Sequence, residues 1–230
     1  MWENLQHQFN RFFVANGATE WWLTGLRTTL IVTVLALIIG VVLGFTVAIV
    51  RSTYEQTGRL KILNIICKIY LTIIRGTPTM IQILIFYSII FASVSLNEII
   101  IGAIAFGVNS GAYVAEIVRS GIMSVDRGQM EAGRSLGLNA GQTMKLIIIP
   151  QAFKNVLPAL INEMIVLLKE TSIIGYIGTI DITKAATLVQ SRTYSAYVPL
   201  LSAAAFYLII VMILTHFMGK LERRLRRNER

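Results

Sequence analysis

The hydrophobic residues of the chain fall into long uncharged runs that are separated by polar segments. Residues 28–50 and residues 196–218 contain no charged side chain, and each of these runs has 23 residues. A helix of that length extends about 34 Å at about 1.5 Å per residue, which is enough to cross a hydrocarbon core of about 30 Å. The two runs exclude an ordinary soluble domain and predict membrane-spanning helices.

Three further apolar runs predict three more spans. The second run is interrupted by Lys68, Arg75 and Pro78, and a long polar segment, residues 119–154, separates the third run from the fourth. The pattern predicts an all-α membrane protein that forms a single domain over residues 1–230. The five predicted spans cover about residues 28–50, 62–90, 99–118, 156–174 and 196–218.

The charges support this class and predict an orientation in the membrane. Charged residues make up 14% of the chain, against roughly 25% in soluble domains. Fourteen of the 21 Lys and Arg residues follow spans one, three and five, whereas four lie in the segments on the other side. The positive-inside rule therefore places the N-terminus outside and the C-terminus in the cytoplasm. The net charge of +9 is explained by this topology, so we infer no nucleic-acid partner.

Candidate chemistry is sparse. The single cysteine excludes an intrachain disulfide, and the two histidines lie near opposite ends of the chain. Neither histidine has Cys or carboxylate neighbours at ligand spacing, so we assign no metal site. No nucleophile–base set occurs at workable spacing, and we assign no catalytic residue.

Two Gly-x-x-x-Gly patterns lie within predicted spans. Gly40 and Gly44 belong to span one, and Gly107 and Gly111 belong to span three. Such patterns let two helix backbones approach closely. Because glycine is common in membrane helices, the patterns by themselves do not identify which helices meet.

The polar segment after span three begins with a helix-start pattern. Asp126 followed by Gln129 predicts a capped helix that runs to about Leu136, and Gly137 suits the left-handed residue that ends it. A short helix with small and charged residues suits insertion into a groove on a partner protein, and a solvated linker is the alternative. The exposed small and polar residues are expected to be Gln129, Glu131, Ala132, Gly133, Arg134 and Ser135.

A second helix-start pattern follows at once. Asn139 and Gln142 again have the cap-plus-three spacing. This second helix is expected to end before Pro150, because proline disfavours helix at the residue before it. The segment therefore predicts two short helices joined by a glycine elbow on the cytoplasmic face.

Here the sequence resembles a known family. Glu131-Ala132-Gly133, then Gly137, then Ile147-Ile148-Ile149-Pro150, is similar to the EAA loop of ABC importer permeases, with Gly133 in place of the second alanine and Ile149 in place of leucine. Both departures keep the size or the apolarity of the side chain. The resemblance extends to the polar amino acid branch, the histidine, glutamine and arginine type, in Ile74–Pro78, Gly111–Arg119, Leu157–Glu163 and Leu168–Ser172.

The resemblance implies the permease subunit of an ATP-driven importer for polar amino acids, with basic ones slightly favoured, in a prokaryotic cell membrane. The implied partners are two copies of an ATPase, a second permease copy or a paralogue, and an extracytoplasmic solute-binding protein. The chain has no phosphate-binding loop, so ATP and Mg²⁺ would be bound by the ATPase and this chain would hold no cofactor. The residues implied in coupling are Asp126, Gln129, Glu131, Ala132, Gly133 and Gly137. A nucleotide-independent channel or facilitator is the alternative, and it would not require the paired capped helices.

Arg75 is the first candidate substrate-binding residue, because ionisable groups inside a membrane are costly and mark functional sites. It can hold a carboxylate by a bidentate pair, or it can pair structurally with Glu98, Glu116 or Glu163. Pro78 removes a helical hydrogen bond and leaves a carbonyl near Ile74 free, which suits a cavity lining.

Span four contributes a second candidate. Glu163 can bind the ammonium group or the cationic side chain of an amino acid, and a pair with Arg75 is the alternative. Asn162 beside it, with Asn109 and Ser110 in span three, are candidate hydrogen-bonding neighbours. Glu116 is expected to pair with Arg119, three residues later on the same helix.

A short outside segment follows span four. Glycines at residues 175 and 178 break the helix there, and Asp181 is expected to cap a short helix through about Gln190. This helix is either a contact for the solute-binding protein or a plain connecting loop.

Overall fold

The structure is a computed structural model, and it describes residues 9–227. Within that range all regular structure is helical. Four helical segments are long and apolar enough to cross a membrane, and the described part has up to five spans if the bent pair Lys61–Gly76 and Thr79–Ile90 counts as one. The all-helical fold is confirmed, and the five predicted spans are reached only when this bent pair is counted as one span. The four unbroken segments are Ala18–Glu55, Glu98–Met123, Ala140–Ile177 and Tyr197–Lys220.

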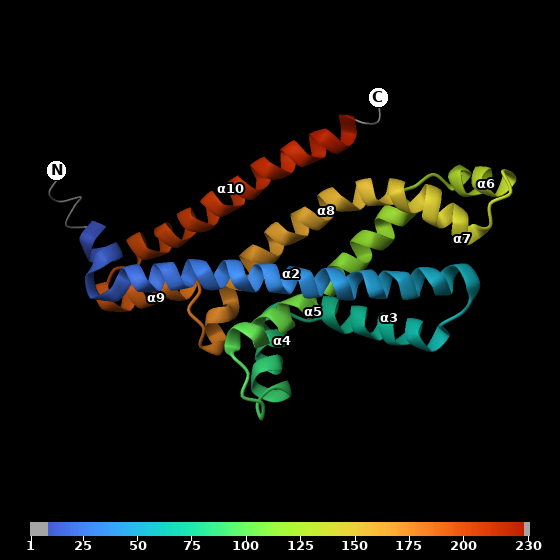
Figure 1. Cartoon of the computed structure of the whole chain (residues 1–230). Coiled ribbons are helices and arrows are strands. Elements are labelled where there is room, and N and C mark those ends of the chain that lie inside the picture. The colour runs from blue at the N-terminus through green and yellow to red at the C-terminus, as the bar shows by residue number, and fades with distance from the viewer. Residues whose placement is uncertain (1–8, 228–230) are drawn as a thin grey trace.

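Figure 1 shows how the helices are arranged along the longest one, α2. α3 lies beside the C-terminal half of α2, and α9 lies beside its N-terminal half. The loop that holds α6 and α7 lies at the same end of the molecule as the turn between α2 and α3. The elements are η1 Asn10–Val14, η2 Ala15–Gly17, α2 Ala18–Thr57, α3 Lys61–Gly76, α4 Thr79–Ile85, η3 Phe86–Ile90, α5 Glu98–Met123, α6 Arg127–Ser135, α7 Ala140–Thr143, η4 Met144–Ile148, α8 Ile149–Glu170, η5 Thr171–Ile177, α9 Ile182–Thr193 and α10 Tyr197–Arg227.

The two Gly-x-x-x-Gly patterns face each other across the contact between α2 and α5. A Cβ atom on Gly44 would lie 2.5 Å from Val114 Cγ1 and 2.9 Å from the carbonyl oxygen of Gly111. A Cβ atom on Gly107 would lie 2.6 Å from Ile39 Cβ. Glycine on both helices therefore sets the close approach of α2 and α5, because any larger side chain would push them apart.

Span two is divided into two helices. The chain bends by 113° between α3 and the segment Thr79–Ile90. Thr77, the residue before Pro78, is extended, with φ −123° and ψ 148°, as expected for a residue whose helical conformation clashes with a following proline ring. The predicted interruption by Pro78 is thus a sharp bend.

The second loop helix does not end before Pro150, and that prediction is wrong. α7 passes into the π-helical segment η4 and then directly into α8, where Pro150 lies in the first turn. The amide of Ile149 donates to Met144 O through the wider π-type turn. A proline is tolerated in a first helical turn, where its missing N–H is not needed, so the helix continues into span four.

α9 begins at the predicted cap. Asp181 is fully buried, and its carboxylate accepts hydrogen bonds from the amides of Thr183 at 2.9 Å and Lys184 at 3.0 Å. Burial raises the pKa of this carboxyl above its ordinary value, although the two amides oppose the shift. α9 continues through Thr193, beyond the predicted Gln190. Its inner face packs against α2 and α10 through Trp22, Ala185, Ala186, Val189 and Ala203.

Candidate functional site

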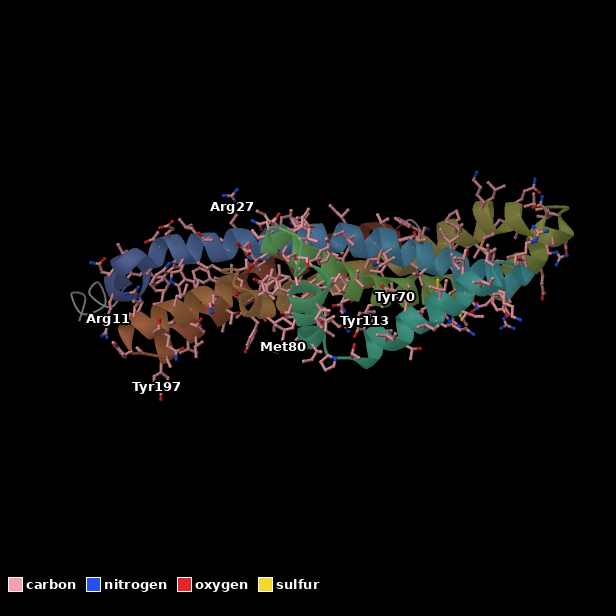
Figure 2. All side chains as sticks on the ribbon, turned by 90° about the horizontal axis from the view of Figure 1, so that it is seen from below. Arg11, Arg27, Tyr70, Met80, Tyr113 and Tyr197 are labelled. Carbon is pink, nitrogen blue, oxygen red and sulfur yellow. The ribbon has the colours of Figure 1, made fainter. Side chains whose placement is uncertain are left out.

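The bend in span two places the end of α3 beside a cavity. This cavity has a volume of about 520 Å³ and takes side chains from α3, α5 and α8. Figure 2 shows Tyr113, which lines it, in the central part of the molecule. The lining residues are Arg75, Tyr113, Glu116, Ile117, Ser120, Gly121, Ser124, Asn155, Ala159 and Glu163.

Arg75 and Glu163 both line this cavity, as two opposite charges, but they do not form an ion pair with each other. The guanidinium carbon of Arg75 lies 6.0 Å from the centre of the Tyr113 ring, within the range of a cation–π contact. Glu163 is 8% exposed, and its carboxylate accepts a hydrogen bond of 2.9 Å from the hydroxyl of Ser110. None of the three ion pairs found among the described side chains includes Glu163.

The ion pairs next to the cavity include one predicted alternative, Arg75 with Glu116, whereas the predicted pair of Glu116 with Arg119 does not form. Glu116 Oε1 lies 2.7 Å from Arg51 Nη1 on α2 and 3.9 Å from Arg75 Nη1 on α3. Arg119 pairs instead with Glu55 of α2, at 3.5 Å. The predicted pair of Glu116 with Arg119 is therefore wrong. The glycine contacts bring α2 so close to α5 that partners on α2 replace the partner on the same helix.

The two candidate asparagines do not join Glu163. Asn109 is 1% exposed, and its Nδ2 donates to Gln82 Oε1 on α4 at 2.8 Å. Asn162 is exposed and does not line the cavity. Successive residues on a helix point about 100° apart, so only one of Asn162 and Glu163 can face inward. Of the predicted neighbours, Ser110 alone contacts Glu163.

The carbonyl that Pro78 leaves free does not line the cavity. Ile74 O accepts a hydrogen bond of 2.8 Å from the side-chain amide of Gln82. Gln82 was not predicted, although a glutamine four residues after a proline in an apolar run is a visible signal. Arg51 was not predicted either, because the distance between Arg51 and Glu116 depends on how α2 and α5 pack.

The first loop helix begins and ends, and the second begins, where their capping residues predict. Asp126 Oδ1 accepts from the amide of Gly128 at 2.6 Å, and Gly137 has a positive φ of 86°. Asn139 and Gln142 form the complete reciprocal capping box, with two bonds of 2.9 Å. Gln129 does not complete the first box, because its Oε1 instead accepts a hydrogen bond of 3.5 Å from the side-chain Nε2 of Gln151.

Gly133 is buried inside the loop, which corrects the expectation that it is exposed. A Cβ atom there would lie 2.5 Å from Thr143 Cγ2, so α6 rests directly on α7 at this residue. Glu131 and Ala132 are exposed, as expected. Leu136, at the end of α6, is 82% exposed. It was not among the predicted contact residues, although a leucine directly before the glycine that ends a polar helix is a recognisable signal.

The comparisons with known proteins agree with this architecture. The sequence model of the family described as "Binding-protein-dependent transport system inner membrane component" matches residues 40–227. The chain belongs to this family. It is a permease subunit of an ABC amino acid importer, as the relatives and the similar structure below also indicate, and not the nucleotide-independent channel considered as the alternative.

Curated relatives of this family member are amino acid permeases. A putative glutamine transport system permease protein, GlnP, of Rickettsia conorii is 39% identical over 206 residues, which cover 87% of this chain and 91% of the relative. The arginine transport system permease protein ArtQ of Bacillus subtilis is 37% identical over 211 residues, covering 90% and 93%. GlnP of Escherichia coli strain K12 is 31% identical over 205 residues, covering 88% and 91%.

Solved structures show the same fold. A crystal structure of an amino acid ABC transporter with histidines superposes with a TM-score of 0.84 at 39% identity, covering 93% of this chain and 98% of the other. An inward-facing structure of the MetNI methionine ABC transporter gives a TM-score of 0.78 at 17% identity, covering 92% and 99%. The second similarity concerns the fold alone.

Proposed function

We propose that this permease imports polar amino acids, with basic ones slightly favoured, and that the cavity between α3, α5 and α8 binds them. The observation that carries the proposal is the presence of Arg75 and Glu163 in one cavity without an ion pair between them. A zwitterion needs a cation for its carboxylate and an anion for its ammonium group. Arg75 would hold the carboxylate as a bidentate pair.

The preference for basic amino acids rests on Glu163. It is a buried carboxylate that accepts a hydrogen bond from the neutral hydroxyl of Ser110. A charge taken out of water is costly without a partner of opposite charge. An arginine or lysine side chain would supply that charge, so Glu163 would stabilise a cationic substrate more than a neutral one such as glutamine.

We also propose that the loop from Asp126 to Gly137 docks on a separate ATPase, which binds ATP and Mg²⁺. The capped ends of α6, its contact with α7 at Gly133, and the continuous helix from η4 into α8 support this role. They join the loop rigidly to the helix that carries Glu163. ATPase closure would thus move α8 and switch the cavity between outward-facing and inward-facing states.

The complete importer would contain two ATPase copies, a second permease copy or a paralogue, and an extracytoplasmic solute-binding protein. It would lie in the lipid bilayer of a prokaryotic cell, with the N-terminus outside and the C-terminus in the cytoplasm. α9 would then lie on the outer side, where the solute-binding protein docks.

The decisive experiment measures ATP hydrolysis and uptake by the assembled complex in liposomes, with arginine and with glutamine. Glu163→Gln keeps the size of the side chain and removes its charge. It should weaken stimulation by arginine at least about tenfold, since a desolvated ion pair is lost, and should affect glutamine less. Asn162→Ala, on the exposed side of the same helix, is the matched control. Unchanged arginine transport in Glu163→Gln would refute the substrate role.

A further inference from the structure

The bend in span two is held by one buried side chain. Gln82, on α4, is 6% exposed. Its Nε2 lies 2.8 Å from Ile74 O, 3.1 Å from Thr77 O and 2.8 Å from Thr77 Oγ1. The Thr77 hydroxyl in turn donates to Ile73 O at 2.8 Å. A helix end leaves its last four carbonyls without backbone partners, and two of these in α3, those of Ile73 and Ile74, accept hydrogen bonds from the side chains of Thr77 and Gln82.

The other end of the same amide is tied to α5. Gln82 Oε1 accepts a hydrogen bond of 2.8 Å from Asn109 Nδ2. An amide side chain donates only from nitrogen and accepts only at oxygen. Because the nitrogen of Gln82 faces the carbonyls of α3, its oxygen faces Asn109, and this orientation satisfies both ends of the Gln82 side chain.

Two consecutive residues of α5 therefore connect it to the bend beside Arg75 and to Glu163. Asn109 reaches the bend through Gln82, and Ser110 donates to Glu163 at 2.9 Å. Arg75 directly follows Ile74, the residue whose carbonyl Gln82 holds. The position of Arg75 relative to Glu163 thus depends on a chain of side-chain hydrogen bonds.

We propose that Gln82 is a positioning residue that holds the 113° bend in span two and thereby sets Arg75 opposite Glu163 for the substrate. The inference rests on the proposed substrate cavity, but it concerns a residue that does not line that cavity. In a bilayer core no water replaces a lost partner, so without Gln82 the carbonyl groups of Ile74 and Thr77 lose the side chain that donates to them. The bend then relaxes and Arg75 moves.

The test uses Gln82→Met in the assembled complex, because methionine has a similar length and no N–H group. Asn109→Ala is a second variant that removes only the tie to α5. The matched control is Tyr70→Phe. The Tyr70 hydroxyl donates to Val108 O at 2.6 Å, which is another bond between α3 and α5 but lies away from the bend. Figure 2 shows Tyr70 in the same central region as Tyr113.

Two measurements are needed. The first is the distance between spin labels on Ile69→Cys and Ile89→Cys, two exposed positions on either side of the bend, in a Cys67→Ser background with labelled copies diluted by unlabelled ones. The second is the dependence of ATP hydrolysis on arginine concentration, analysed as KM and kcat separately.

Gln82→Met should broaden the label distance distribution and raise KM about tenfold, which is about 1.4 kcal/mol, while kcat changes less than about threefold. Asn109→Ala should act in the same direction, and Tyr70→Phe should change neither quantity. The proposal is overturned by an unchanged distance distribution, by an unchanged KM, or by an equal effect of Tyr70→Phe. A wild-type complex that no amino acid stimulates would instead refute the proposed function, and this outcome is seen before any variant is compared.

Discussion

Because Gly133 contacts Thr143, we predict that Gly133→Ala destabilises the loop, and that it stabilises the loop instead once Thr143 is replaced by alanine. A Cβ atom on Gly133 would lie 2.5 Å from Thr143 Cγ2, 2.9 Å from Thr143 Oγ1 and 3.1 Å from Ile147 Cδ1. Thr143 is fully buried and donates its hydroxyl to Asn139 O at 3.1 Å. As a β-branched residue it has few alternative rotamers, so it cannot turn aside.

Two opposing effects decide the size of the change in Gly133→Ala. Overpacking by one methyl group costs about 1–3 kcal/mol, and the shortest of these distances places this site near the upper end. Alanine also stabilises a helix by about 1 kcal/mol relative to glycine. The net loss of about 1–2 kcal/mol predicts about 5- to 30-fold faster opening of the loop. In a Thr143→Ala background the clash is removed, and the same substitution should stabilise the loop by about 1 kcal/mol.

Hydrogen exchange over residues 133–143 measures this opening directly. The region includes the amide of Leu138, which donates to Gly133 O at 3.2 Å. Exchange should become faster in Gly133→Ala than in the wild type, and slower in the double variant than in Thr143→Ala alone. The same direction of change in both backgrounds would refute the proposed contact between α6 and α7.

Three further predictions concern other parts of the chain. Leu136→Ser should weaken co-purification of the ATPase about 10- to 100-fold, which corresponds to the free energy of burying a leucine side chain. The melting temperature of the permease alone should not change. Unchanged co-purification would exclude Leu136 from the docking surface. Arg51→Gln should raise the KM for arginine several-fold, because Glu116, without Arg51, competes with the substrate for the guanidinium group of Arg75. Arg119→Gln breaks a surface ion pair between the same two helices and should leave this KM unchanged. Equal effects of the two substitutions would contradict the prediction. Because burial raises the pKa of Asp181, the folded chain binds this proton at a higher pH than the unfolded chain does. Its contribution to the free energy of unfolding therefore falls as the pH rises from the ordinary aspartate pKa of about 4 toward the raised pKa. Asp181→Asn should remove this part of the pH dependence of the melting temperature, and an unchanged pH dependence would count against it.

Features that depend on a few neighbouring residues were predictable from the sequence. The caps at Asp126, Asn139 and Asp181, and the left-handed Gly137, all lie where local side-chain chemistry indicates. A cap needs only a short polar side chain within three residues of free amides, and a span needs only a sufficient length of apolar residues. Neither condition depends on the rest of the fold.

Features that depend on how helices pack were not predictable in this way. The partner of Glu116 lies on α2 because facing glycines bring α2 and α5 together, and Gly133 is buried because α7 folds back onto α6. Pro150 does not end a helix, because a π-helical segment before it lets the chain continue into α8.

The sequence by itself determined that this chain is a bundle of membrane-spanning helices with a capped polar loop. It also determined that Arg75 and Glu163 are ionisable residues within membrane-spanning segments. Only the tertiary structure decided that these two charges share a cavity without pairing, and that Gln82 links the bend beside Arg75 to α5. The physical reason is the distance along the chain over which each interaction acts. Hydropathy and capping act within one segment of chain, whereas an ion pair or a buried amide bond forms only where separate helices place their side chains within about 3 Å.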